Sequence, residues 1–152
     1  MALDIIVGDL FTQTLDRDVI IAHGCNSHGV MGYGVAKIVK DLYPAAFRDY
    51  YDVHKQTGLH VGQVIISEGK IGKPTIAHLI TQEHYGRDNK MYITYDAVVV
   101  ACQAVAKFAK SVNKEVHIPL IGGGLGGGDP RRLIAIFQGA FRDVNATLWL
   151  QE

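Results

Sequence analysis

Glycine is concentrated in two short segments of this chain. Of its 17 glycines, four lie between Gly24 and Gly34 and six between Gly122 and Gly128. Because glycine has no side chain, such segments bend sharply and let another group approach the backbone closely. For the first segment, a tight structural turn is as good an explanation as the close approach of another group. Stability alone does not explain the second, since each glycine costs about 0.5 to 1 kcal/mol relative to alanine in regular structure.

Strands and helices are predicted to alternate along the chain. Short, mostly β-branched runs predict strands over 3–7, 19–23, 61–67, 74–81, 115–120 and 146–150. Apolar residues at helical spacing predict helices over 33–56, 94–111 and 130–143. Pro44 should break or kink the first helix. This order predicts one domain over residues 1–152, an α/β fold with three α/β/α layers and a mixed, mostly parallel central sheet.

Composition argues against several classes of protein. The chain has 15 basic and 15 acidic residues, whereas proteins that neutralise polynucleotide phosphates usually carry a basic excess. Direct nucleic-acid binding is therefore not expected. No apolar run approaches the ~20 residues that cross a bilayer, so no membrane association is expected and a soluble, cytoplasmic protein is predicted. Cys25 and Cys102 form no C-x-x-C pair, which suits a reducing compartment, and no metal or other cofactor is predicted.

Both glycine segments follow a predicted strand and precede a predicted helix. In open α/β sheets, ligands bind beyond the carboxyl ends of the strands. A glycine-rich turn that leads into a helix offers unpaired N–H groups to a phosphate there, so two such turns side by side predict a diphosphate site. Gly122, Gly124 and Gly127 also match G-x-G-x-x-G. That dinucleotide fingerprint opens the first βαβ unit, however, and only about 25 residues follow it here.

Four segments carry a more specific pattern. They read GDL at 8–10, HGCNSHGVMGYGVAK at 23–37, LITQ at 79–82 with YGRD at 85–88, and IGGGLGGGD at 121–129. In this order and spacing the chain resembles, over essentially its whole length, the macrodomain family of ADP-ribose-binding proteins. It looks most like the subgroup that contains ADP-ribose 1''-phosphate phosphatases. The resemblance implies ADP-ribose or ADP-ribose 1''-phosphate as the ligand.

The resemblance also implies roles for individual residues. Asp9 would accept a hydrogen bond from the adenine amino group, and the backbone N–H of Leu10 would support the ring. Asn26 would bind the hydroxyls of the distal ribose. Backbone contacts to that ribose and to the diphosphate would come from Gly32, Gly34, Val35, Gly122, Gly124, Leu125 and Gly126. Trp149 stands where relatives often carry an aromatic residue beside the adenine, although a core position in its predicted strand is slightly favoured.

Two residues are candidate catalysts. His23 precedes Asn26 at the predicted end of a strand, and an imidazole with a pKa near 6.5 exchanges protons at neutral pH. The phosphatases that this chain resembles carry a histidine at the same place. The hypothesis is that His23, with a bound water or as the attacking group, removes phosphate from ADP-ribose 1''-phosphate. Asp129 is the second candidate, as a base or orienting carboxylate, although Asp before Pro130 is more typical of a helix N-cap.

Two other activities stay open. The chain has Gln82 where macrodomains that remove ADP-ribose through a lysine intermediate have lysine, and glutamine cannot form that intermediate. A lysine-dependent route is therefore not expected. The alternatives to the phosphatase are a binding module for free or protein-linked ADP-ribose without turnover, and a lysine-independent ADP-ribosyl hydrolase.

Overall fold

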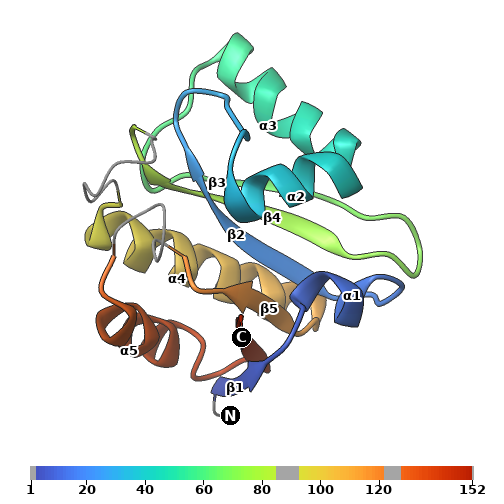
Figure 1. The fold of residues 1–152 in the computed structure, drawn as a ribbon, viewed down its shortest axis with the longest axis vertical. Coiled ribbons are helices and arrows are strands. Elements are labelled where there is room, and N and C mark those ends of the chain that lie inside the picture. The colour runs from blue at the N-terminus through green and yellow to red at the C-terminus, as the bar shows by residue number, and fades with distance from the viewer. Residues whose placement is uncertain (1–2, 85–92, 122–127, 152) are drawn as a thin grey trace.

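The computed structural model describes residues 3–84, 93–121 and 128–151 (Figure 1). Its strands are β1 (Leu3–Val7), β2 (Ile20–Asn26), β3 (Val64–Ser67), β4 (Thr75–Gln82), β5 (Val116–Pro119) and β6 (Ala146–Leu150). Its helices are α1 (Leu10–Thr14), α2 (Gly34–Leu42), α3 (Pro44–Gln56), α4 (Tyr95–Val112) and α5 (Pro130–Ala140). Among the helices of these ranges, none is long and apolar enough to cross a membrane.

The strands form one six-stranded sheet in the order β1-β6-β5-β2-β4-β3. Strand β3 runs antiparallel to β4, and the other neighbouring pairs are parallel. The mixed, mostly parallel sheet predicted from the sequence is therefore confirmed. The carboxyl ends of the parallel strands meet at one edge, where ligands bind in folds of this class.

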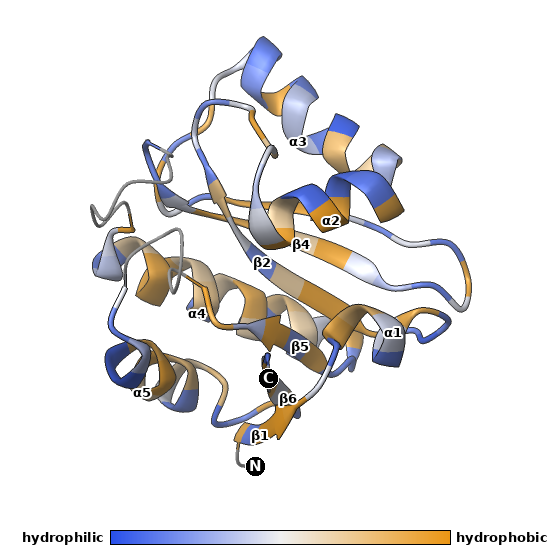
Figure 2. Ribbon diagram, viewed as in Figure 1, coloured by the Kyte–Doolittle hydropathy of each residue, from blue (hydrophilic) through white to orange (hydrophobic). Residues whose placement is uncertain are grey.

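Helices cover both faces of the sheet (Figure 1). Successive strand residues point to opposite faces, so Ile20 and Ala22 of β2 join the core cluster shared with α4 and α5, whereas Ile21 packs in the cluster under α1 and α2. Figure 2 shows that α4 is largely hydrophobic, whereas α3, on the opposite face, carries many hydrophilic residues. The predicted three-layer α/β/α arrangement is confirmed.

One confirmed prediction and one difference from the predicted elements affect the site. The break predicted at Pro44 is confirmed: the residues predicted as a helix over 33–56 form α2 and α3, and Pro44 stands in the first turn of α3, where its missing N–H costs nothing. The strand predicted to end at His23 continues to Asn26, because Gly24 and Cys25 still pair with Leu79 and Ile80 of β4. His23 therefore lies in the middle of β2 and not at its end.

Candidate functional site

A cleft of about 320 Å³ lies at the carboxyl ends of β1, β5 and β6, between the starts of α1 and α2. Its lining residues are Gly8, Asp9, Leu10, Phe11, Val35, Ile38, Pro119, Trp149 and Gln151. The structure thus brings together Asp9, Leu10, Val35 and Trp149, which the sequence singled out from segments far apart in the chain. The lining is mostly apolar with few polar groups, which is typical of a small-molecule site.

Asp9 stands at the mouth of the cleft as the N-cap of α1. Its Oδ1 accepts a hydrogen bond of 3.0 Å from the backbone N–H of Phe11, and its side chain is otherwise exposed. A carboxylate has two oxygens that accept several hydrogen bonds. The cap therefore fixes the orientation of Asp9 and leaves acceptor capacity for a ligand. Leu10, the next residue, buries its side chain in the core beneath the cleft.

Trp149 forms one wall of the cleft and also belongs to the core. Its side chain is 9% exposed and packs in the same cluster as Leu10 and Phe11. A Cβ on Gly8 would lie only 3.1 Å from Cζ3 of the indole. Gly8 therefore makes room for Trp149. The core position that the sequence slightly favours is confirmed, and a place beside the adenine stays a prediction.

Asn26 organises the loop that follows β2. Its Nδ2 donates to the carbonyl oxygen of Val30 at 2.8 Å, and its Oδ1 accepts from the backbone N–H of His28 at 2.9 Å. The hydroxyl of Tyr50, on α3, donates to the carbonyl oxygen of Asn26 at 2.6 Å. Asn26 is thus a buried residue that closes the loop on itself. The sequence did not indicate this structural role, and the predicted contact with the distal ribose stays a prediction.

Glycine occupies the positions of the first segment for different reasons. Gly29 has φ +75°, and a Cβ there would lie 2.6 Å from Cδ2 of His54, so the fold requires glycine. Gly34 begins α2 with φ +58°, a conformation that residues with side chains rarely adopt. Gly32 is exposed, and among the described residues a Cβ there would come within 4 Å of Cγ1 of Val30 alone, at 3.8 Å. The described part of the fold therefore does not require glycine at position 32, and the predicted ligand contact at Gly32 stays a prediction.

Ile121, the residue before the second glycine segment, packs against Gly24 of the first segment. Gly122, Gly124, Leu125 and Gly126 lie outside the described residues, but Ile121 before them is described. A Cβ on Gly24 would lie 2.7 Å from Cγ2 of Ile121, so the absence of a side chain at Gly24 lets Ile121 pack against β2. The chain therefore enters the second segment next to the strand that leads into the first.

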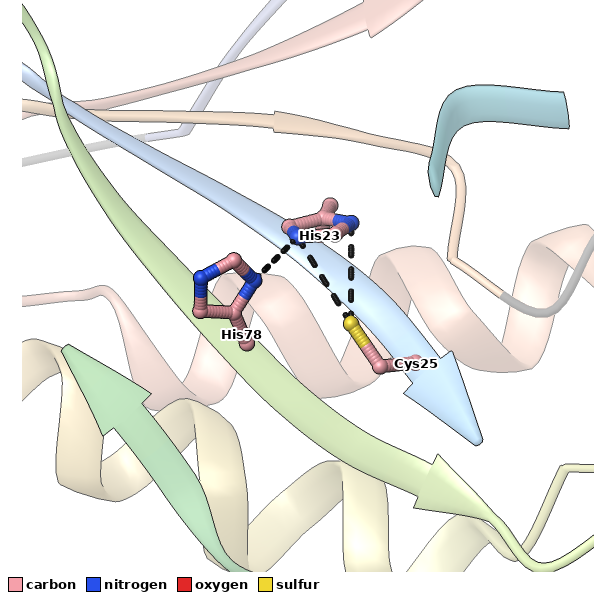
Figure 3. Close-up of side chains that lie close together, drawn as sticks. All are labelled: His23, Cys25 and His78. Atoms are coloured by element: carbon pink, nitrogen blue, oxygen red, sulfur yellow. Dashed lines mark hydrogen bonds between the residues drawn. The ribbon is translucent and has the colours of Figure 1, made fainter. Parts of the chain in front are cut away.

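His23 lies in a buried cluster with Cys25 and His78 (Figure 3). Its imidazole is 0% exposed, and its Nε2 lies 2.8 Å from Nδ1 of His78. The Nε2 of His78 is in turn 3.0 Å from Oγ of Ser67. Burial lowers the pKa of both imidazoles, that of His78 to about 4, so both are neutral at neutral pH. His23 has no surface in this structure with which to reach a ligand directly.

The same cluster contains the donor types that hold soft metals, but their geometry is not that of a coordination site. Sγ of Cys25 lies 3.7 Å from Nδ1 and 3.6 Å from Nε2 of His23 (Figure 3). Nε2 of His23 and Nδ1 of His78 are only 2.8 Å apart, the distance of a direct hydrogen bond. Two nitrogen ligands at about 2.0 to 2.1 Å from one tetrahedral zinc ion lie farther apart than this. Burial also raises the pKa of the Cys25 thiol, which keeps it protonated. As arranged, the three side chains pack and hydrogen-bond with one another.

Comparison with known proteins decides the family. A profile of the Macro domain family matches residues 22–137. The chain belongs to the macrodomain family. An ADP-ribose 1''-phosphate phosphatase of Candida albicans is 29% identical over 131 residues, which are 80% of this chain and 83% of the relative. The family predicted from the sequence is therefore confirmed.

Solved structures agree with this macrodomain fold. A structure of a protein of unknown function from Bacteroides thetaiotaomicron has a TM-score of 0.87 at 26% identity and covers 99% of this chain and 98% of its own. Thermosipho africanus DarTG in complex with ADP-ribose has a TM-score of 0.78 at 19% identity and covers 99% of this chain and 42% of its own. The second likeness concerns the fold alone.

Asp129 of this macrodomain is the N-cap of α5, as its sequence context favours. Its Oδ1 accepts from the backbone N–H of Arg131 at 3.0 Å, and its own N–H donates to the hydroxyl of Tyr95 at 2.8 Å. The side chain is 49% exposed. Asp129 thus presents an accessible carboxylate close after the second glycine segment. Its catalytic role stays a prediction.

Proposed function

We propose that this macrodomain binds ADP-ribose and hydrolyses ADP-ribose 1''-phosphate to ADP-ribose and inorganic phosphate. The observation that carries the proposal is the meeting of Asp9, Leu10, Val35 and Trp149 around one cleft at the carboxyl ends of the strands. The name of the Candida albicans relative, an ADP-ribose 1''-phosphate phosphatase, supports the substrate.

In the proposed complex, the adenine occupies the cleft against Trp149, and its amino group donates to the carboxylate of Asp9. The backbone of Gly32, Gly34 and Val35 contacts the distal ribose and the diphosphate from one side. Gly122, Gly124, Leu125 and Gly126 contact the diphosphate from the other side, and Asn26 binds the distal ribose. The cleft volume of about 320 Å³ lies within the range of small-molecule sites and suits the base end of the ligand.

In the proposed reaction, a water molecule attacks phosphorus and the bond from phosphorus to the anomeric oxygen breaks. The water loses a proton to a base, the anomeric oxygen of ADP-ribose takes up a proton, and inorganic phosphate leaves. Backbone N–H groups of the glycine segments stabilise the negative charge that builds on the phosphate oxygens. The exposed carboxylate of Asp129 is suited to accept the proton from water.

His23 enters this proposal indirectly. Because its imidazole is buried and hydrogen-bonded to His78, a direct step at the phosphate would require it to leave the core. In the described conformation it supports β2, three residues before Asn26. We therefore propose His23 as a positioning residue, and the same assay tests whether it also acts on the substrate.

Phosphate release from ADP-ribose 1''-phosphate tests the proposal. Asp129→Asn keeps the N-cap, because asparagine caps helices as well as aspartate does, but it removes the base. We expect turnover to fall by about 10² or more while affinity for ADP-ribose stays within about threefold of wild type. Asp143→Asn, an exposed residue after the same helix, is the matched control and should change neither quantity.

Other outcomes of this assay favour the alternatives. Unchanged turnover in Asp129→Asn would remove that residue from the mechanism. A strong loss of turnover in His23→Ala with unchanged stability would support direct catalysis by His23. If wild type binds ADP-ribose but releases no phosphate, the protein is a binding module or an ADP-ribosyl hydrolase. In the second case Gln82, whose Nε2 donates to the carbonyl oxygen of His84 at 2.6 Å, supplies no lysine-type nucleophile.

We also propose a cytoplasmic location. Cys25 and Cys102 are both free and buried. Buried unpaired thiols suit a reducing compartment.

A further inference from the structure

Behind the cleft, a series of hydrogen-bonded side chains connects the protein surface to Trp149. The indole Nε1–H donates to Nδ1 of His117 at 2.9 Å, and Nε2 of His117 lies 2.7 Å from Oε1 of Glu115. The guanidinium of Arg17 forms an ion pair with the same carboxylate. His117 is only 3% exposed. This series of side chains therefore connects an exposed ion pair to a wall of the cleft through a buried imidazole.

The partners of His117 select one protonation state. An indole N–H can only donate, so Nδ1 of His117 must be the acceptor and carry no proton. Nε2 therefore carries the proton and donates it to the carboxylate of Glu115. A second proton on the ring would have to occupy Nδ1, where it would face the indole N–H across 2.9 Å. Two donors cannot form that bond, so Trp149 would lose its partner.

We propose that neutral His117 is a positioning residue of the cleft, which holds the indole of Trp149 in the orientation that receives the aromatic base of the ligand. This inference rests on the proposed function, because it takes the cleft as the site of the adenine. Trp149 packs under Gly8 on its other side, so the hydrogen bond to His117 and this contact together determine the plane of the ring. Protonation of His117 is then incompatible with the binding-competent cleft.

The charges around His117 give the direction of the pH dependence. Burial lowers its pKa below the ordinary value of 6.5, Glu115 opposes this shift, and Arg17 adds slightly to it. Because the pKa is lowered in the folded protein, the bond from Trp149 is fully present above pH 6.5. It is lost as pH falls through the folded value. Affinity for ADP-ribose should therefore be constant above pH 6.5 and fall by up to about tenfold per pH unit below the folded pKa.

Trp149 is the only tryptophan of the chain, so its fluorescence reports directly on this bond. The experiment follows emission between pH 8 and about pH 4.5 without ligand, and ADP-ribose affinity over the same range. His117→Gln keeps an acceptor oxygen for the indole but does not titrate, so both profiles should lose the transition seen in wild type. Glu115→Gln removes the charge that raises the pKa of His117, and should move the transition to lower pH. His60→Gln, at an exposed histidine, is the control and should follow wild type.

Each result has a definite meaning. The inference is overturned if the fluorescence of His117→Gln shows the same pH transition as wild type. It is also overturned if the transition in Glu115→Gln occurs at the same pH as in wild type. Because Glu115→Gln retains a hydrogen-bonding group beside His117, it tests the inference even if His117→Gln fails to fold. Absence of ADP-ribose binding in wild type at pH 7.5 would overturn the proposed function itself. That failure is distinguishable, because the fluorescence transition is measured without ligand.

Discussion

Gly32→Val is expected to weaken ADP-ribose binding by at least about a hundredfold, about 2.8 kcal/mol, with little change in stability. Gly32 is exposed, and within the described part of the chain a Cβ there would approach only Cγ1 of Val30, at 3.8 Å. A valine side chain is therefore accommodated by the protein but occupies the space through which the ligand approaches the backbone. Calorimetric titration measures the affinity. Urea denaturation should give a free energy of unfolding within about 0.5 kcal/mol of wild type.

Gly29→Ala is the control, because it adds a methyl group in the same loop at a position where the expected loss is in stability. The positive φ of Gly29 alone costs alanine about 1 to 2 kcal/mol, and the contact at 2.6 Å with the His54 ring adds to this cost. We expect a clear loss of stability at position 29 and a clear loss of affinity at position 32. Unchanged affinity in Gly32→Val would refute the placement of the ligand along this loop.

Asn26→Ala is expected to reduce both stability and binding strongly. The substitution removes the side chain that joins Val30 and His28 to the end of β2, and it removes an acceptor of the Tyr50 hydroxyl. Buried groups left without partners cost about 1 to 3 kcal/mol each, so a total loss of about 3 kcal/mol is expected. ADP-ribose affinity should fall by at least about a hundredfold, because the loop that presents Gly32 loses its shape. Urea denaturation and calorimetry measure the two effects.

Tyr50→Phe separates the two roles of Asn26. It removes the hydroxyl that donates to the carbonyl oxygen of Asn26, but leaves the Asn26 side chain in place. We expect a loss of about 1 to 2 kcal/mol in stability and less than about tenfold in affinity. If Asn26→Ala binds ADP-ribose as tightly as wild type, both its proposed contact with the distal ribose and its proposed role in shaping the loop are wrong.

The spacing of apolar residues and the positions of glycine and proline predicted much of this fold. The last strand was predicted over 146–150, the range of β6, and Asp129 with Pro130 predicted the N-cap of α5. These features depend on residues close in sequence. Helix α1 was not predicted, because its five residues are too few to show a helical period.

The position of His23 could not be predicted locally. Gly24 suggests the end of a strand, but here its missing side chain accommodates Ile121, about a hundred residues later, and β2 continues past it. The roles of Tyr50 and His117 depend likewise on partners distant in sequence, Asn26 and Trp149. The family resemblance identified Asp9, Leu10 and Val35 as ligand-binding candidates, and the structure places them around one cleft.

Calorimetric titration of the wild-type protein with ADP-ribose at pH 7.5 tests directly whether the cleft and the two glycine segments bind this ligand. We expect saturable binding of one ADP-ribose per chain, weakened at least about a hundredfold in Gly32→Val and retained in Asp129→Asn. Absence of saturable heat at ADP-ribose concentrations up to about 1 mM would mean a binding free energy weaker than about 4.1 kcal/mol. That result would contradict the assignment of the cleft and both glycine segments to this ligand.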